Sequence, residues 1–289
     1  MQRGADETCL WFQSTTLAPD DLGLCATAFI ETIFGPRVPA LDVLELAYLN
    51  RRSVHGSFFS ENGRLGIRAS YCIYEKEPAP QLVVFLLLKA MGEQLALGFG
   101  IYQSEFIENT LSVNRANLEY PRRWVDAPSA SAMDENVKRF TQYGLISTRG
   151  IHGLVLEVPL NDGPPSRMLN PAAETALLHV SVNILHPLSG VGYLATIALP
   201  MDPPKNKIAE WSAFLNSQEH TMQDFVPRLG AWGIRGLKNE LVYSMFWPTD
   251  SANNQLDATI MNWMVFRAQW IKNRYWSPGV GLTLEKGNG

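Results

Sequence analysis

The chain has 289 residues, of which 46% are hydrophobic and 18% are charged, and its formal net charge is -4. This composition supports a folded core and excludes global disorder. The 24 basic and 28 acidic residues form no block of one sign, so the charge pattern predicts no nucleic-acid partner. The length is typical of two domains of ordinary size.

Cysteine usage and the apolar segments indicate the compartment. Cys9, Cys25 and Cys72 are too few and too widely spaced for a disulfide framework, and none forms a CxxC pair that zinc would use. The first twelve residues lack the apolar segment of a signal peptide. The longest strictly apolar run, 82–88, is too short to cross a bilayer. We therefore expect a cytoplasmic protein with no membrane insertion.

The first quarter of the chain is predicted to contain two helices and a hairpin. Acidic residues at 20–21 open a helix whose apolar residues keep helical spacing to Ile33. A second helix is expected over 39–51. Strands over 53–60 and 64–74 flank the turn Glu61-Asn62-Gly63, because Asn-Gly is a strong hairpin signal.

The rest of the chain predicts further helices and strands around one linker. Residues 120–132 are rich in Pro, Ser and Ala and are interpreted as that linker. Hydrophobic periodicity places the other elements. We expect helices at 81–94, 104–117, 134–143, from 203 through 215, and at 251–276, and strands at 150–160, 175–185, 192–199, 230–235 and 240–247. The fold class is therefore α+β.

Two segments of the chain resemble each other. The sequence Leu46-Ala47-Tyr48-Leu49-Asn50 is similar to Ser212-Ala213-Phe214-Leu215-Asn216, and each ends a predicted helix that precedes two antiparallel strands. This order predicts two related units of twisted antiparallel sheet packed against helices. We expect a shorter unit over 1–128 and a second unit over 133–289, which together would form a pseudo-dimer within one chain.

This order of elements resembles the bacterial-type YbjN-like and type III secretion chaperone-like group. The resemblance extends over about two thirds of the chain and is fullest from Asp134 to Trp276. It implies a twisted antiparallel sheet packed against helices and a non-enzymatic role in binding other proteins. The family group carries no diagnostic catalytic motif, so the resemblance rests on the order of elements.

No catalytic or metal-binding motif is present in the sequence. No two histidines are three or four residues apart, so a helix cannot present a metal-binding pair, and we predict neither a metal site nor a cofactor. His179 and Glu157 are the best candidates for acid-base work, His179 because it shares a strand face with Ser181 and Asn183. A polar solvent-facing row of an antiparallel sheet is the other interpretation.

Tryptophan is the unusual feature of the composition. Six of the eight lie in the last 79 residues, and indole rings suit both core corners and binding anchors. Trp263 is expected to face the sheet, whereas Trp276 is the best candidate for an exposed ring. The residues predicted to contribute to binding are Trp276, Tyr275, Trp247, Trp232 and Trp270.

Three functional hypotheses follow from these observations. The first is a non-enzymatic chaperone or adaptor that binds a protein partner through an apolar, aromatic-rich groove. The second is an enzyme or carrier with an aromatic-lined pocket for an apolar small molecule, and the third is a structural subunit of a larger assembly. A deep pocket with a titratable group favours the second, a groove or an open sheet edge the first, and a large flat apolar patch the third.

Overall fold

The computed structural model describes most of the predicted elements. The described residues are 7–15, 25–35, 40–51, 53, 56–74, 130–150, 153–161, 174–186, 190–201, 205–221, 228–235, 240–248 and 254–283. The predicted helices over 81–94 and 104–117, and the linker residues 120–129, lie outside them.

The chain divides into two compact units that are not consecutive halves. The first unit comprises Met1–Glu119, Pro204–Asn239 and Tyr243–Phe246, and the second unit comprises Tyr120–Pro203, Glu240–Val242 and Trp247–Gly289. This grouping differs from the predicted units 1–128 and 133–289, because residues 204–239 pack with the N-terminal part of the chain.

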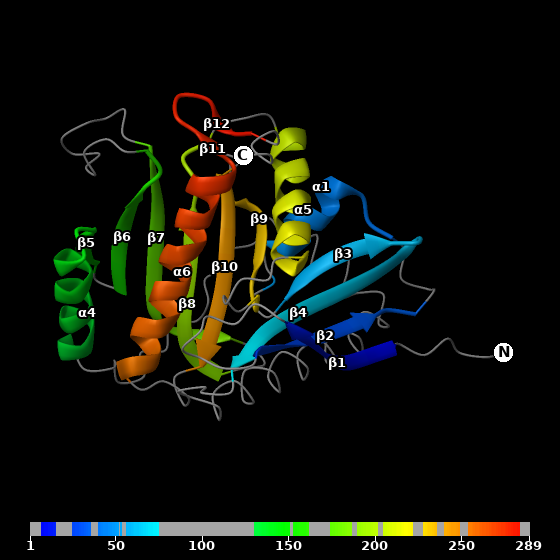
Figure 1. Cartoon of the computed structure of the whole chain (residues 1–289), viewed down its shortest axis with the longest axis horizontal. Coiled ribbons are helices and arrows are strands. Elements are labelled where there is room, and N and C mark those ends of the chain that lie inside the picture. Colours follow the sequence, from blue (N-terminus) through cyan, green and yellow to red (C-terminus); the bar gives the residue numbers. More distant parts are fainter. Residues whose placement is uncertain are drawn as a thin grey trace. The chain divides into compact units, whose positions relative to one another are not determined.

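Among the described residues, the first unit holds a four-stranded antiparallel sheet and the helices α1 and α5 (Figure 1). Its elements are β1 Glu7–Thr15, β2 Cys25–Ile33, α1 Val43–Asn50, β3 Ser57–Glu61, β4 Arg64–Tyr74, α5 Lys205–Thr221 and β9 Ala231–Arg235. The strand order in the sheet is β1-β2-β4-β3, so β3 is an edge strand. Helix α1 packs against α5 and β9. A side chain at Gly233 of β9 would clash with the main chain of Arg51, so glycine permits this close approach.

The predicted helix over 20–33 is wrong, because residues 25–33 form β2. Ala28, Ile30 and Thr32 are buried, whereas Phe29 and Glu31 between them are half-buried. The apolar residues of this segment fit a helical spacing and an alternating spacing equally, and pairing of β2 with β1 and β4 selects the strand.

The predicted hairpin is confirmed. Glu61 pairs with Arg64, which leaves a two-residue turn in which Asn62 has φ 52° and Gly63 has φ 74°. Positive φ at both turn residues is typical of a type I′ turn, which Asn-Gly favours. The predicted second helix is also present, although shorter than expected, with Asp42 accepting a hydrogen bond from the Glu45 N–H at its start.

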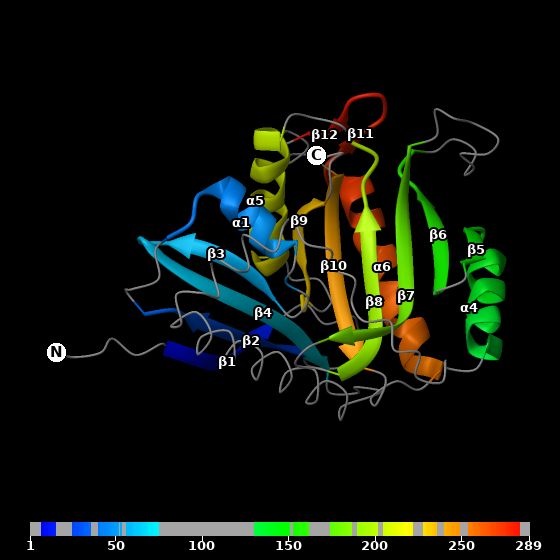
Figure 2. The ribbon, with the colours of Figure 1, turned by 180° about the vertical axis from the view of Figure 1, so that it is seen from behind.

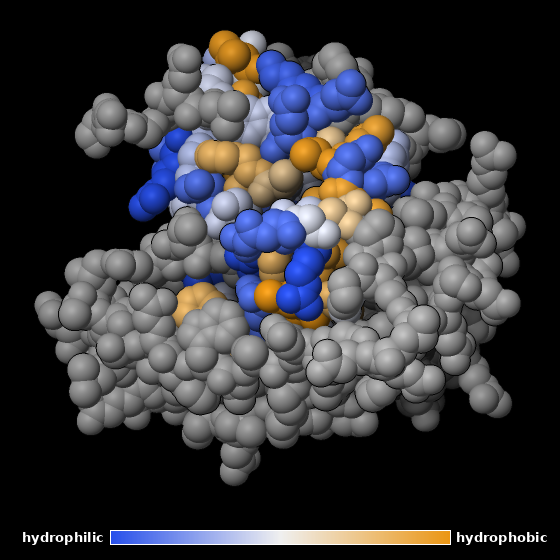
Figure 3. All heavy atoms as spheres, turned by 90° about the vertical axis from the view of Figure 1, so that its right-hand side faces the viewer, coloured by the Kyte–Doolittle hydropathy of each residue, from blue (hydrophilic) through white to orange (hydrophobic). Residues whose placement is uncertain are grey.

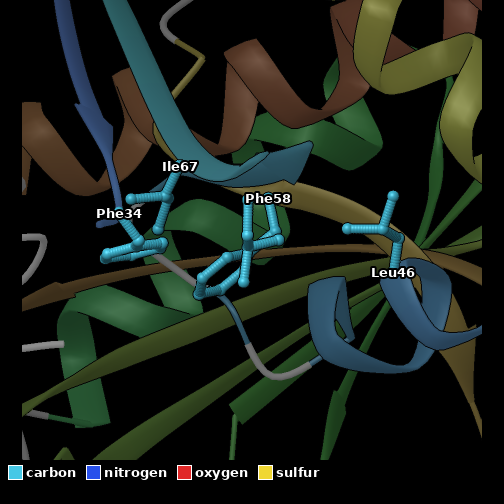
Figure 4. Packing of buried hydrophobic residues seen from close by; sticks show 5 residues of the cluster. Phe34, Leu46, Phe58 and Ile67 are labelled. Atoms are coloured by element: carbon cyan, nitrogen blue, oxygen red, sulfur yellow. The ribbon is translucent and has the colours of Figure 1, made fainter. Parts of the chain in front are cut away.

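The core of the first unit lies between its sheet and α1 (Figure 4). Phe34, Leu65 and Ile67 are almost fully buried, and the rings of Phe34 and Phe58 stack with centroids 6.3 Å apart. Leu46 of α1 completes this cluster. The helix is therefore held against the sheet by apolar burial, which leaves its other side available to α5 and β9.

The second unit contains both predicted and unpredicted elements of the second half of the chain. They are α4 Ala130–Gln142, β5 Ile146–Gly150, β6 Gly153–Pro159, β7 Thr175–His186, β8 Gly190–Ala198, α6 Asn254–Arg274, β11 Trp276–Ser277 and β12 Gly281–Leu282. Strand β10, Glu240–Pro248, contributes residues to both units. Residues 130–132 belong to α4 rather than to the predicted linker, and β5, β11 and β12 were not predicted.

The larger sheet has the strand order β5-β6-β7-β8-β10-β9. Alternate residues of β6, β7 and β8, among them Leu156, Leu178 and Ile197, are buried. Helix α6 packs against these three strands, and Figures 1 and 2 show it along one face of them. Within the described residues, no helix is long and apolar enough to cross a membrane.

The two sheets share a strand order. In the four-stranded sheet the order is β1-β2-β4-β3, and α1 connects β2 to β3. In the larger sheet four neighbouring strands have the order β7-β8-β10-β9, and α5 connects β8 to β9. Each sheet therefore contains a segment with the chain order strand-strand-helix-strand-strand. In both sheets the last two strands of this segment lie in the reverse of their chain order.

Candidate functional site

The candidate site is a groove in the first unit, here called the α1–α5 groove, with a volume of about 510 Å³. Residues of the edge strand β3 and of the helices α1 and α5 line it. Its lining residues are Leu41, Asp42, Val43, Leu46, Ala47, Asn50, Ser57, Phe58, Phe59, Ser60, Glu61, Arg68, Ser212, Ala213, Asn216 and Ser217. Apolar side chains from three elements are therefore gathered with serine, amide and charged groups.

The edge of β3 is closed by residues of its own unit. The Asn50 side-chain N–H donates to the Phe58 carbonyl at 3.0 Å, and the Asn50 side-chain oxygen accepts from the Phe58 N–H at 2.6 Å. The Leu41 N–H donates to the Ser60 hydroxyl at 2.9 Å. The two Asn50 bonds occupy main-chain groups of β3 to which an added strand would pair, so the geometry favours side-chain binding in the groove over strand addition.

Arg68 is the basic residue among the described lining residues of the groove, which also include the acidic Asp42 and Glu61. It lies on β4 opposite Ser57 of β3 and Glu31 of β2. Its guanidinium carbon is 3.5 Å from the centroid of the Phe59 ring, which is a cation–π contact. Its Nε is 3.7 Å from Glu31 Oε2, and its Nη2 is 3.7 Å from Glu61 Oε2. Both distances exceed that of a hydrogen bond.

Burial acts on both members of the Arg68–Glu31 pair. Desolvation raises the pKa of Glu31 above its ordinary value, and the positive charge of Arg68 opposes this increase. Desolvation likewise lowers the pKa of Arg68, against the attraction of Glu31 and Glu61. An arginine keeps its proton at neutral pH, so the groove wall carries a fixed positive charge that is only partly solvated.

The α5 side of the groove has a contact like that of α1. The Asn216 side-chain oxygen accepts from the Trp232 N–H at 2.8 Å, and its side-chain N–H donates to the Trp232 carbonyl at 2.9 Å. The Ser212 hydroxyl donates to the same carbonyl at 2.7 Å. Asn50 and Asn216, the last residues of the two similar segments, therefore make the same contact. Each hydrogen-bonds the main chain of the first strand after its helix.

None of the predicted aromatic anchors is among the described lining residues of this groove. Trp232 is 0% exposed, and its indole N–H donates to Glu219 Oε1 at 2.6 Å. Trp270 and Tyr275 are buried and meet edge to face at 5.1 Å. The side chain of Trp247 lies outside those that the structure describes.

The expected exposure of Trp276 is wrong, because its ring is 2% exposed. Its indole N–H donates to Glu174 Oε2 at 2.7 Å, and the Gly279 N–H donates to Glu174 Oε1 at 2.6 Å. Trp263 is only half-buried, so the relative burial of these two tryptophans is the reverse of the prediction. The carboxylate that orders the ring comes from a distant part of the sequence.

The candidate catalytic residues Glu157 and His179 lie in the second unit on one face of the sheet. Val155 pairs with His179, and Glu157 pairs with Leu177, so the two residues are diagonal neighbours on β6 and β7. Both are half-buried, on the face opposite the buried residues that α6 covers. They are not lining residues of the α1–α5 groove.

Metal-binding groups do not cluster in the part of the chain that the structure describes. No group of three or more histidine, cysteine, aspartate or glutamate side chains there is arranged to hold a metal ion. On the side of the molecule shown in Figure 3, the coloured hydrophobic residues lie in small groups between hydrophilic ones. The α1–α5 groove gathers apolar, amide and charged groups and is therefore taken as the candidate site.

Comparisons with known proteins assign no family to the chain. No protein-family model matches the sequence, and neither the curated proteins nor the solved structures contain a significant match.

Proposed function

We propose that this protein binds another protein, as a chaperone-like or adaptor protein, and that the α1–α5 groove is the binding surface. The observation that supports the proposal is a groove whose apolar residues come from both helices and from β3, including Leu46, Phe58 and Ala213. Val43 at the start of α1 lines the same groove and is 43% exposed. An apolar groove between two helices with an exposed apolar rim fits side chains of a protein partner.

The polar groups of the groove favour binding over catalysis. Asn50, Ser212 and Asn216 hydrogen-bond main-chain groups of the unit. Asp42 caps α1. Neither a histidine nor a cysteine is among the lining residues that the structure describes, and those residues form no evident nucleophile-base pair.

We also propose that the chain contains two related repeats, β1-β2-α1-β3-β4 and β7-β8-α5-β9-β10, that form a pseudo-dimer within one chain. The shared strand order and the matching contacts of Asn50 and Asn216 support this proposal. Helices α1 and α5 hold corresponding positions in the two repeats, and both line the groove. An internal pair would present two helices to one partner without self-association. The resemblance to the YbjN-like and type III secretion chaperone-like group supports the same protein-binding role.

A carrier of an apolar small molecule is the second candidate function. A volume of about 510 Å³ falls within the range of small-molecule sites. The exposed rim at Val43 favours the protein partner, because a small ligand would leave that rim in water.

Filling the groove should abolish partner binding. Ser217 of α5 is exposed and lines the groove, so Ser217→Trp places an indole there without disturbing the core. We expect affinity for a partner co-purified from the native host and then isolated to fall about tenfold or more, equivalent to about 1.4 kcal/mol. Lys207→Trp, at an exposed α5 position that does not line the groove, is the matched control. Equal affinities of the two variants and the unmodified chain would refute the proposed surface.

A further inference from the structure

The guanidinium of Arg68 has unused hydrogen-bonding capacity. Its Nε is buried without a hydrogen-bond partner among the described residues. Within the same part of the chain, its polar contacts are two ion pairs at 3.7 Å, and its face rests on the Phe59 ring. Buried N–H groups are normally paired, so an unpaired donor in a groove wall indicates a missing acceptor. The missing group should be negatively charged or strongly polar.

We propose that Arg68 binds an acidic side chain of the protein partner, while an adjacent apolar side chain of the partner enters the α1–α5 groove. This inference rests on the proposed function and specifies the chemistry of the bound segment. The stacking of Arg68 on Phe59 fixes the plane of its donors, and a planar fork of donors matches a carboxylate. The apolar part of the site is the neighbouring surface of Leu46, Phe58 and Ala213.

The two glutamates beside Arg68 leave room for this acceptor. Glu61 ends β3, and its side chain is 66% exposed, so it can turn into solvent when another carboxylate approaches. Glu31 is more buried and is not a lining residue of the groove. An acidic ligand would therefore compete with Glu61 for Arg68, and removal of the Glu61 charge should strengthen its binding. A basic ligand would show the opposite dependence on Glu61.

The test uses the full chain and short linear peptides selected from a random phage-displayed library. We expect the selected peptides to combine Asp or Glu with apolar residues. Arg68→Gln should lower their affinity about tenfold or more, Arg68→Lys should restore part of it, and Glu61→Gln should raise it severalfold. Circular dichroism verifies the fold of each variant, and Ser217→Trp should block binding if the peptides occupy the groove.

Each outcome supports or overturns one of the two proposals. Peptides that Ser217→Trp blocks but that contain no acidic residue, or that bind Arg68→Gln as tightly as the unmodified chain, would overturn the role of Arg68 and leave the groove proposal standing. Lower affinity in Glu61→Gln would overturn the acidic ligand even if Arg68→Gln did not fold. Failure to select any peptide that Ser217→Trp blocks would count against the groove proposal itself. Groove binding by a small apolar carboxylate but by no peptide would overturn the protein-side-chain assignment.

Discussion

Replacing Trp276 with alanine is expected to lower the free energy of unfolding by about 3–5 kcal/mol, the range for emptying a buried aromatic site. The ring is 2% exposed, and its indole N–H is hydrogen-bonded to Glu174. The same carboxylate accepts the Gly279 N–H, so the mutation also weakens the β11–β12 turn. Urea titration followed by circular dichroism would measure the loss.

Trp263→Ala is the matched control for this prediction. Trp263 lies on α6 and is half-buried, so its removal should cost clearly less than that of Trp276. A larger loss for Trp263→Ala than for Trp276→Ala would contradict the burial of the two rings.

The second large effect is expected from the paired asparagines. Asn50→Ala leaves the buried Phe58 N–H and carbonyl without the Asn50 amide, whereas Asn216→Ala leaves the Trp232 N–H without its acceptor while the Trp232 carbonyl keeps the Ser212 hydroxyl. Each substitution should cost about 2–5 kcal/mol, with Asn216→Ala at the lower end. Asn262→Ala, at an exposed position of α6, should change stability by less than about 0.5 kcal/mol. Differential scanning calorimetry of the three variants would compare them. If the paired asparagines cost no more than Asn262, the matching contacts are not structural equivalents.

Secondary structure was predicted correctly from the sequence where the residue pattern was compatible with a single structure. Leu154, Leu156 and Val158 are buried and alternate with half-buried residues in β6, which lies within the strand predicted at 150–160. The Asn62-Gly63 turn was predicted because few residues tolerate positive φ. Residues 25–33 were mispredicted because their apolar residues fit two periods, and only pairing with β1 and β4 decides between them.

The candidate site depends on contacts between residues that are distant in the sequence. Asn50 and Asn216 were found from the similarity of their segments, although their contacts with Phe58 and Trp232 required the structure. The sequence alone did not single out Arg68. Its role follows from the nearby ring of Phe59 and from α5, which lies more than a hundred residues later in the chain. Such long-range packing has no local signal.

Residue-specific photocrosslinking tests the protein-binding claim most directly. A benzophenone amino acid at Ser217, on the groove side of α5, should form a covalent adduct with the partner in the native host. The same group at Lys207, an exposed α5 position outside the groove lining, should form little or none. Mass spectrometry should locate the Ser217 adduct in one segment of one partner protein, and Arg68→Gln should weaken it. Equal crosslinking from both positions, or no protein adduct from Ser217, would contradict binding through the α1–α5 groove.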